Sequence, residues 1–426
     1  LKELREKALN EDYFEKLIEE YLLSTTSSVT VTLSPDPDKP AATQLEEQRR
    51  LAEYDNSLDD NEQQELVIRT KELMELQQVP NDLETLALLP QLARSDLSTN
   101  IPYHTAEIID LSGTEVVVSE LATNHISYFD IGFDIRSLPV RLIPYLDMFG
   151  TIATEIGTSR LDYMSFAKEV ATCTGGFSHT FNAYSHRGTK EIRPIFWMQL
   201  KCLPGYLERA LQLAAEVLSD LSLENRSRIR EIVGREFAWA EHSAQSEGYN
   251  LAASRVFAHL SDAGQYNELF SGATSYLTIK DLVLNYDEKE EAFLADLQEI
   301  GTLLFNKNNL VLSTTGQKDE LQKFSDIGSG LIDGLSDAAI QHQRLPGANL
   351  PDHEAFITSA EVVYNVQGGK LFNGNEYNGH FEVLKTYLSR DYLWNTVRQM
   401  GGAYGCFIQF SQITGNIAFI SYRDPQ

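Results

Sequence analysis

The feature that most constrains this sequence is a helix that runs into paired glycines and then into a hairpin, within residues 381–422. Apolar side chains recur at helical spacing over residues 381–397, which predicts a helix with one face on a core. Gly401 and Gly402 then end the helix, because two adjacent glycines allow backbone torsions that other residues resist. We therefore expect a sharp helix-to-strand corner.

The corner leads into two short apolar runs that predict paired strands. Residues 407–410 and 417–420 have the composition of strands, and Thr-Gly-Asn at residues 414–416 supplies a tight turn between them. A corner built on rigid elements can hold side chains in a fixed direction. We expect Arg398 and Tyr404, which flank the glycines, to point into a cleft.

Composition limits the partners that this chain can have. Its 426 residues are too many for one ordinary core and enough for two or three modules. The formal net charge of −27 argues against nucleic acid and anionic membrane, which both require a positive surface. The acidic charge is best interpreted as keeping a large protein soluble; attraction of basic peptides is a weaker hypothesis.

Cysteine usage and the chain start bear on compartment and completeness. Cys173, Cys202 and Cys406 are odd in number and far apart, which predicts no disulfide framework and a reducing compartment. No apolar run has the length of a membrane span, and the N-terminus has no signal-peptide pattern. The chain does not begin with Met, so we expect it to start within a longer protein.

A helix followed by a strand occurs twice and suggests duplicated modules. Residues 11–33 give an amphipathic helix and then an alternating strand at residues 29–33. Residues 293–304 and 309–313 repeat this order. We therefore predict that residues 1–35 are the tail of a preceding module.

Four regions follow from these patterns, with α+β as the fold class. Residues 36–43 should be a linker, and residues 44–77 a pair of polar helices that turn at residues 59–61. The predicted regions are a module tail (1–35), a linker with a helical hairpin hinge (36–101), a peptidase-like module without catalytic residues (102–316) and the start of a second, truncated module (317–426).

The module at residues 102–316 should combine strands and helices. We predict that residues 116–118 and 128–135 form paired strands, and that residues 142–156 form a helix. Further predicted elements are strands at 177–184 and 195–200, helices at 206–218 and 225–242, and, in the second module, a helix at 318–335 and a strand at 360–366.

Two stretches resemble a known family. Tyr-Leu-Trp-Asn-Thr-Val-Arg at residues 392–398, followed by Gly-Gly-Ala-Tyr-Gly at residues 401–405, resembles the corner in the C-terminal half of pitrilysin-type zinc metallopeptidases, the inverzincins. The match is closest to the presequence protease subfamily. Residues 88–97 after the helical hairpin are similar to the hinge between the halves of those enzymes. The resemblance implies pitrilysin/LuxS-like modules, in which helices cover an antiparallel sheet, preceded by that hinge.

The resemblance places the zinc site outside this chain. The catalytic module of the family carries H-x-x-E-H on the helix after its second strand, whereas residues 142–150 contain no histidine. None of the nine histidines has a neighbour at the spacing that puts two imidazoles on one helical face. We expect no metal or cofactor in this chain, and zinc in the N-terminal half of the complete enzyme.

The resemblance also assigns roles at the corner. Arg398 and Tyr404 would be catalytic, with Tyr404 as the donor to the oxyanion or carbonyl oxygen and Arg398 holding a substrate carbonyl and helping to lock the halves together. Gly401, Gly402 and Ala403 would bind substrate. The structural alternative is that Arg398 pairs with a nearby acid and Tyr404 packs in the core.

The sequence therefore predicts the C-terminal, zinc-free half of a metalloendopeptidase that degrades unstructured peptides in a closed chamber. Its partners would be the N-terminal catalytic half and the peptides, and the chain alone would be inactive. The strand at residues 177–184, which in the catalytic module pairs with substrate, would line the chamber wall here. The expected location is the cytoplasm, with an organelle matrix as the alternative. The rival hypothesis is a non-catalytic scaffold or binding subunit of the same fold.

Overall fold

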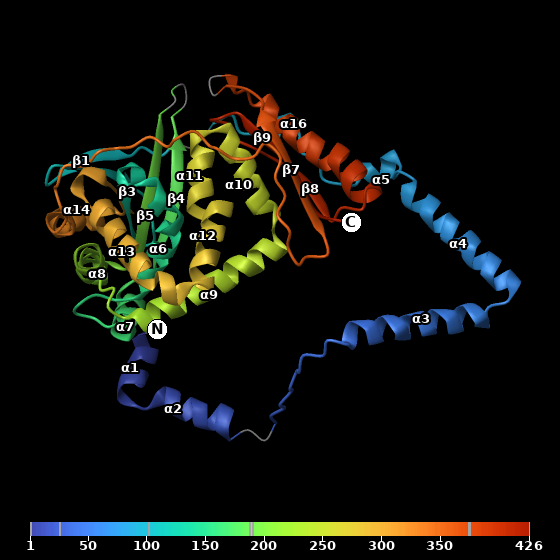
Figure 1. Ribbon diagram of the computed structural model, residues 1–426, viewed down its shortest axis with the longest axis horizontal. Helices are drawn as coiled ribbons and strands as arrows, with labels where there is room; N and C mark the ends of the chain where they lie inside the picture. Colours follow the sequence, from blue (N-terminus) through green and yellow to red (C-terminus); the bar gives the residue numbers. More distant parts are fainter. Residues whose placement is uncertain are drawn as a thin grey trace. The chain divides into compact units, whose positions relative to one another are not determined.

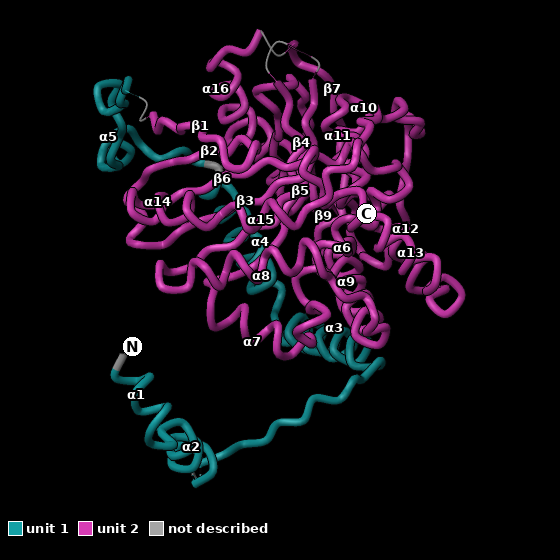
Figure 2. Tube along the Cα trace, turned by 90° about the vertical axis from the view of Figure 1, so that its left-hand side faces the viewer, with its two compact units in different colours: residues 1–101 teal, residues 102–426 magenta. Residues whose placement is uncertain are grey.

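The computed structural model describes residues 2–24, 27–100, 103–186, 189, 191–373 and 376–425. The chain divides into two compact units, residues 1–101 and 102–426 (Figure 2). The predicted boundary between residues 101 and 102 itself lies outside the described residues. None of the described helices is both long and apolar enough to cross a membrane.

The first unit consists of helices, and none of its described residues is buried. Its α-helices are α1 (Lys2–Asn10), α2 (Tyr13–Ile18), α3 (Lys39–Ser57), α4 (Asp60–Gln78) and α5 (Leu83–Ala87); a π-helical turn, Glu19–Leu23, continues α2, and a 3-10 turn spans Arg94–Asp96.

The helical hairpin of α3 and α4 is confirmed, and its turn has a clear cause. The Asp59 side chain accepts hydrogen bonds from the backbone N–H groups of Asn61 and Glu62, and the Glu62 side chain accepts one from the Asp59 N–H. This capping box starts α4 at the predicted position. The predicted linker at residues 36–43 is too long, because α3 already begins at Lys39 with Pro40 in its first turn, where proline favours a helix start.

The strand predicted at residues 29–33 is wrong. These residues have no regular structure and their apolar side chains, including Val29 and Leu33, are exposed. A strand forms only when a neighbouring backbone satisfies its N–H and C=O groups, and the described residues of the first unit contain helices and irregular segments but no strand.

The second unit contains a six-stranded sheet in the order β1-β2-β6-β3-β5-β4. Its strands are β1 (Glu107–Leu111), β2 (Thr114–Glu120), β3 (Ser127–Asp134), β4 (Phe177–Ser185), β5 (Ile192–Cys202) and β6 (Leu310–Gly316). All neighbours are antiparallel except β2 and β6, which are parallel. The predicted pairing of β2 with β3 is wrong, because β6 inserts between them after a long excursion of the chain.

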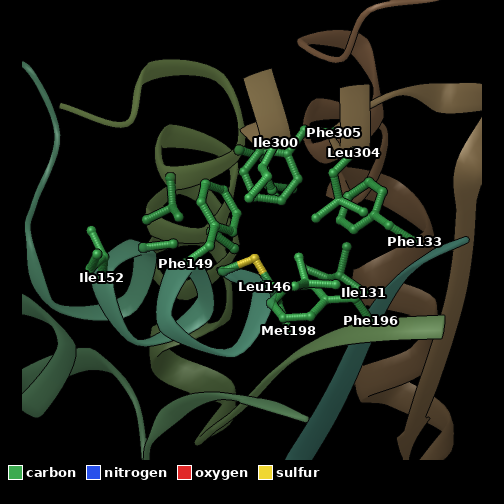
Figure 3. Close-up of a cluster of buried hydrophobic side chains, with 14 of the residues drawn as sticks. Ile131, Phe133, Leu146, Phe149, Ile152, Phe196, Met198, Ile300, Leu304 and Phe305 are labelled. Atoms are coloured by element: carbon green, nitrogen blue, oxygen red, sulfur yellow. The ribbon is translucent and has the colours of Figure 1, made fainter. Parts of the chain in front are cut away.

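Helices surround this sheet and fill the core. The α-helices are α6 (Leu146–Glu155), α7 (Tyr163–Cys173), α8 (Leu207–Asp220), α9 (Arg226–Ser246), α10 (Tyr249–Leu260), α11 (Asp262–Ser271), α12 (Ala273–Leu284), α13 (Tyr286–Leu304), α14 (Lys318–Ile327) and α15 (Ser329–Asp333). The helix predicted at residues 142–156 begins as the 3-10 segment Val140–Tyr145, which contains Pro144. Side chains from β3, α6 and α13, such as Phe133, Phe149 and Ile300, meet in the core (Figure 3).

A three-stranded sheet follows in the order β7-β9-β8, built from β7 (Val363–Lys370), β8 (Gly405–Phe410) and β9 (Asn416–Asp424). It repeats part of the first sheet: a strand, helices, an edge strand and an inner strand follow in sequence, giving β3-β5-β4 there and β7-β9-β8 here. Helix α10 packs against β7 and β9, and α11 packs against β4, so these helices lie between the sheets (Figure 1). The division into modules at residue 316 stays a prediction.

Candidate functional site

The helix that leads to the corner extends over the predicted range but widens as it goes. α16 (His380–Tyr387) continues into π-helical segments, Leu388–Tyr392 and Trp394–Met400. π-Helical turns are uncommon and often occur at functional sites. Arg398 lies in the last of these turns, immediately before the paired glycines.

The two glycines form the corner for different reasons. Gly402 has φ +79°, a left-handed conformation that glycine adopts without strain. At Gly401 an added Cβ would lie 2.6 Å from the carbonyl oxygen of Val397, so a side chain there would collide with the preceding helical turn. The Gly402 N–H donates to Arg398 O at 3.1 Å and the Ala403 N–H donates to Val397 O at 3.2 Å. The bend is therefore fixed by backbone hydrogen bonds.

Arg398 and Tyr404 lie together at the surface of the second unit. The guanidinium carbon of Arg398 is 4.0 Å from the centroid of the Trp394 ring and 5.7 Å from that of Tyr404. Tyr404 is 58% exposed, and Arg398 forms no ion pair with an acid among the described residues. Both observations differ from the structural alternative, which required an acidic partner for Arg398 and a buried Tyr404.

Arg423, at the end of β9, is a site residue that the sequence did not reveal. Its guanidinium carbon lies 5.5 Å from the Tyr404 ring centroid, and its carbonyl oxygen accepts the Tyr404 N–H at 3.4 Å. Its backbone has φ +52°, which is uncommon for a residue other than glycine. Two guanidinium groups thus contact one phenol ring. Their positive charge favours any negative charge that develops near the Tyr404 hydroxyl.

The strands behind the corner provide an aromatic support. The ring of Tyr422 on β9 lies 5.7 Å from that of Tyr404 and 5.5 Å from that of Tyr249 on α10. Burial, together with the nearby Asp424 carboxylate, raises the pKa of the Cys406 thiol on β8. A protonated thiol is a poor nucleophile, so Cys406 is suited to packing rather than to covalent catalysis.

The residues of this chain do not fit a zinc site. On α6, the helix where the resemblance would put the zinc motif, Asp147 lies 3.0 Å from His179 Nε2 of β4. A catalytic zinc requires three protein ligands. Across the described residues, no group of three or more His, Cys, Asp or Glu side chains is arranged to hold a metal ion.

Two family models match the chain. Residues 33–282 match the family described as associated with subgroup C of the M16 peptidases, and residues 353–426 match the PreP C-terminal domain. The chain belongs to this family of peptidase-associated regions. The first match covers more than half of the chain, and the second includes the whole Arg398–Tyr404 corner. The predicted resemblance to presequence proteases is confirmed.

Curated relatives of this family member are longer proteins. Protein HypA of Clostridium perfringens is 30% identical over 427 residues, covering 98% of this chain and 43% of the relative. Presequence protease 1, chloroplastic/mitochondrial, of Arabidopsis thaliana is 28% identical, covering 97% of this chain and 38% of the relative. The mitochondrial presequence protease of Xenopus tropicalis is 24% identical, with 98% and 43% covered. The chain therefore spans less than half of the length of these relatives.

Solved structures share the fold. A peptidase M16 inactive domain from Pseudomonas fluorescens superposes with a TM-score of 0.52 at 16% identity, covering 75% of this chain and 74% of that one. A protease from Helicobacter pylori gives a TM-score of 0.51 at 16% identity, covering 76% of each chain. These likenesses confirm the α+β fold class. The roles of the five corner residues predicted from the sequence stay predictions.

Proposed function

We propose that this chain is the C-terminal, zinc-free half of a presequence-protease-like metalloendopeptidase that degrades unstructured peptides in a closed chamber. Membership of the M16 peptidase-associated family supports the peptidase class. The N-terminal half of the complete protein would be its partner and would supply the zinc site. This half would supply enclosure and two side chains at the corner, and would be inactive alone. We infer a reducing location, the cytoplasm or alternatively an organelle matrix, because Cys173, Cys202 and Cys406 are free.

The observation that carries the proposal is an exposed phenol between two guanidinium groups on a rigid corner. Peptide hydrolysis places negative charge on the carbonyl oxygen as the tetrahedral intermediate forms, and a fixed donor aimed at that oxygen stabilises the charge. Tyr404 would donate its O–H to this oxygen. Arg398, held against Trp394, would hold a neighbouring carbonyl of the substrate and help to lock the two halves together.

The predicted substrate contacts of Gly401, Gly402 and Ala403 would come from their carbonyl oxygens. Their N–H groups all donate within the corner, and the Ala403 side chain is buried. An extended peptide has free N–H groups along its length. Such a contact therefore selects for an extended backbone rather than for particular side chains.

The test uses the complete protein and the substitution Tyr404→Phe, which removes only the hydroxyl. We expect kcat for an unstructured fluorogenic peptide to fall about a hundredfold to a thousandfold, with little change in KM. The control is Tyr387→Phe, because Tyr387 is an exposed tyrosine on α16. An unchanged kcat for Tyr404→Phe would show that this phenol does not take part.

The same experiment addresses the rival function as a scaffold or binding subunit. A solved relative of this fold is titled an inactive domain, so the fold occurs without activity. A complete wild-type protein that binds unstructured peptides but cleaves none would favour the scaffold.

A further inference from the structure

A cavity of about 680 Å³ lies inside the second unit, bordered by the edges of both sheets. It is lined by residues 182–185 at the end of β4 and residues 408–411 at the end of β8. Side chains of a strand alternate between its two faces, so a cavity over one face meets every second residue. This cavity meets four consecutive residues on each strand. It therefore follows the strand edges; we call it the edge cavity.

Both strands present unpaired backbone groups there. β4 and β8 are the last strands in their sheets, and within the described residues β4 pairs with β5 alone and β8 with β9 alone. The open edge of a strand carries a row of N–H and C=O groups that can pair with another extended chain. The edge cavity thus offers backbone hydrogen bonds from two sides. Helices α10 and α11 supply the remaining wall, through residues such as Ala253 and Asn267.

Charge distinguishes the edge cavity from the rest of the molecule. Although the chain has a formal net charge of −27, the described residues that line this cavity include no carboxylate, and Lys385 is the one charged residue among them. A second cavity of about 500 Å³, beside α9, has the carboxylates of Asp147, Glu236 and Glu247 in its wall. Amide and hydroxyl groups dominate the edge cavity instead. This lining suits a neutral backbone and a single negative group near Lys385.

Two lining side chains have spare capacity for a ligand. Lys385 Nζ lies 3.6 Å from Glu382, a long and partly exposed ion pair, and 5.5 Å from the Phe410 ring centroid. Asn416 is 4% exposed and donates through Nδ2 to Ser261 Oγ at 2.9 Å. Its Oδ1 has no hydrogen-bond partner among the described residues. A buried amide oxygen without a partner costs free energy, which a peptide N–H could relieve.

We propose that the edge cavity binds an extended peptide segment by strand addition to β4 and β8, with the C-terminal carboxylate of the peptide at Lys385. Strand addition obtains affinity from main-chain hydrogen bonds, so recognition is largely independent of sequence. This site is separate from the Arg398–Tyr404 corner. It needs no zinc and no catalysis, and it belongs to this chain alone.

The first test measures binding to the 426-residue chain. The probe is a fluorescein-labelled octapeptide of alternating serine and valine with a free C-terminal carboxylate, followed by fluorescence anisotropy. Asn267→Trp places a large ring in the cavity wall and is expected to weaken binding at least tenfold. Gln322→Trp, at an exposed position of α14 away from the cavity, is the matched control and should leave the affinity unchanged. Equal binding by wild type and Asn267→Trp would overturn the proposal.

The second test separates backbone pairing from other modes of binding. Methylation of alternate peptide nitrogens removes N–H donors and leaves the side chains unchanged, so the methylated probe should bind at least tenfold more weakly. Equal binding by the methylated probe would overturn strand addition. Amidation of the C-terminus and Lys385→Met should each weaken binding severalfold and should not add, whereas Lys318→Met, an exposed lysine, should have no effect. Full additivity would overturn the role of Lys385. Because no cleavage is measured, failure of the proposed catalysis would leave these results unaffected.

Discussion

At the scale of single residues, the corner depends on the backbone conformation of Gly402. Its φ of +79° costs other L-residues about 1–2 kcal/mol, and an added Cβ would contact the Pro425 ring at 3.4 Å. We expect Gly402→Ala to lower the free energy of unfolding by about 1–2 kcal/mol. Urea unfolding followed by tryptophan fluorescence measures this change in the second unit, because Trp197, Trp239 and Trp394 all lie there.

A matched glycine shows whether the conformation is the cause. At Gly205 an added Cβ would meet no atom within 4 Å, and no left-handed φ occurs there. Gly205→Ala should therefore change the stability by a few tenths of a kcal/mol at most. Similar losses for the two substitutions would show that the φ of Gly402 is not what limits this position.

Residue patterns revealed part of the site and missed the rest for a physical reason. Arg398 and Tyr404 were predicted because they flank glycines that end a helix, which is a local signal. Arg423 has no such signal in its own surroundings. The register of β8 with β9, in which Gly405 lies opposite Tyr422, carries Arg423 to the Tyr404 ring. Register depends on pairing across the whole hairpin, so a local reading of the sequence does not give it.

At the scale of secondary-structure elements, α10 is tied to its neighbours by Arg255. The Arg255 guanidinium donates to Glu268 on α11 at 3.0 Å and to both carboxylate oxygens of Glu354, at 2.7 and 2.8 Å. Glu268 is only 2% exposed. Removing one partner of a buried pair leaves an uncompensated charge, so Arg255→Met should lower the free energy of unfolding by about 3–5 kcal/mol. Urea unfolding gives the value.

The control for this loss is an arginine whose ion pair is exposed. Arg230 pairs with Asp287 at 2.6 Å, and both side chains are more than half exposed. Arg230→Met should cost about 1 kcal/mol or less, because water and salt screen such a pair. If it costs as much as Arg255→Met, burial of Glu268 is not the reason for the larger effect.

The Arg255 cluster also predicts a dependence of stability on pH. The hydrogen bond from Arg255 lowers the pKa of Glu354 below its ordinary value of 4.5. A carboxyl with a lowered pKa in the folded state stabilises the fold above its unfolded pKa, and this contribution is lost as the pH falls through the folded pKa. The stability difference between wild type and Glu354→Gln should thus be constant near pH 7 and shrink below about pH 4.5. A difference that grows on acidification would contradict this sign.

Elements were predicted where the signal is local, and mispaired where it is not. The periodicity of apolar residues gave α8, α9, β4 and β5 within a few residues of their bounds. The partners of β2 were not predicted, because β6 reaches the sheet only after residue 309. The strand predicted at residues 29–33 failed for the opposite reason: its alternation is genuine, but the described part of the first unit supplies no strand to pair with it.

At the scale of the whole molecule, the two units differ in what stabilises them. The second unit contains every buried residue that the structure describes, whereas the described residues of the first unit's helices have no buried face. Helices without tertiary packing are marginal in water. Hydrogen–deuterium exchange by mass spectrometry should therefore show α3 and α4 exchanging within seconds and β3 and β5 protected for hours.

The irregular segment at residues 338–362 serves as an internal reference for rapid exchange, since it belongs to the second unit but is largely exposed. Slow exchange of α3 and α4 in this chain would mean that they are protected by a partner surface.

The insertion of β6 between β2 and β3 fixes the order in which this protein can be completed during synthesis. The ribosome delivers β2 and β3 early, yet the gap between them stays open until residues 310–316 have left the exit tunnel. Until then each of these strands has one bare flank at which another nascent chain could attach. Slow translation just before residue 310 would prolong that vulnerable interval, and a chaperone acting there would have the most to protect.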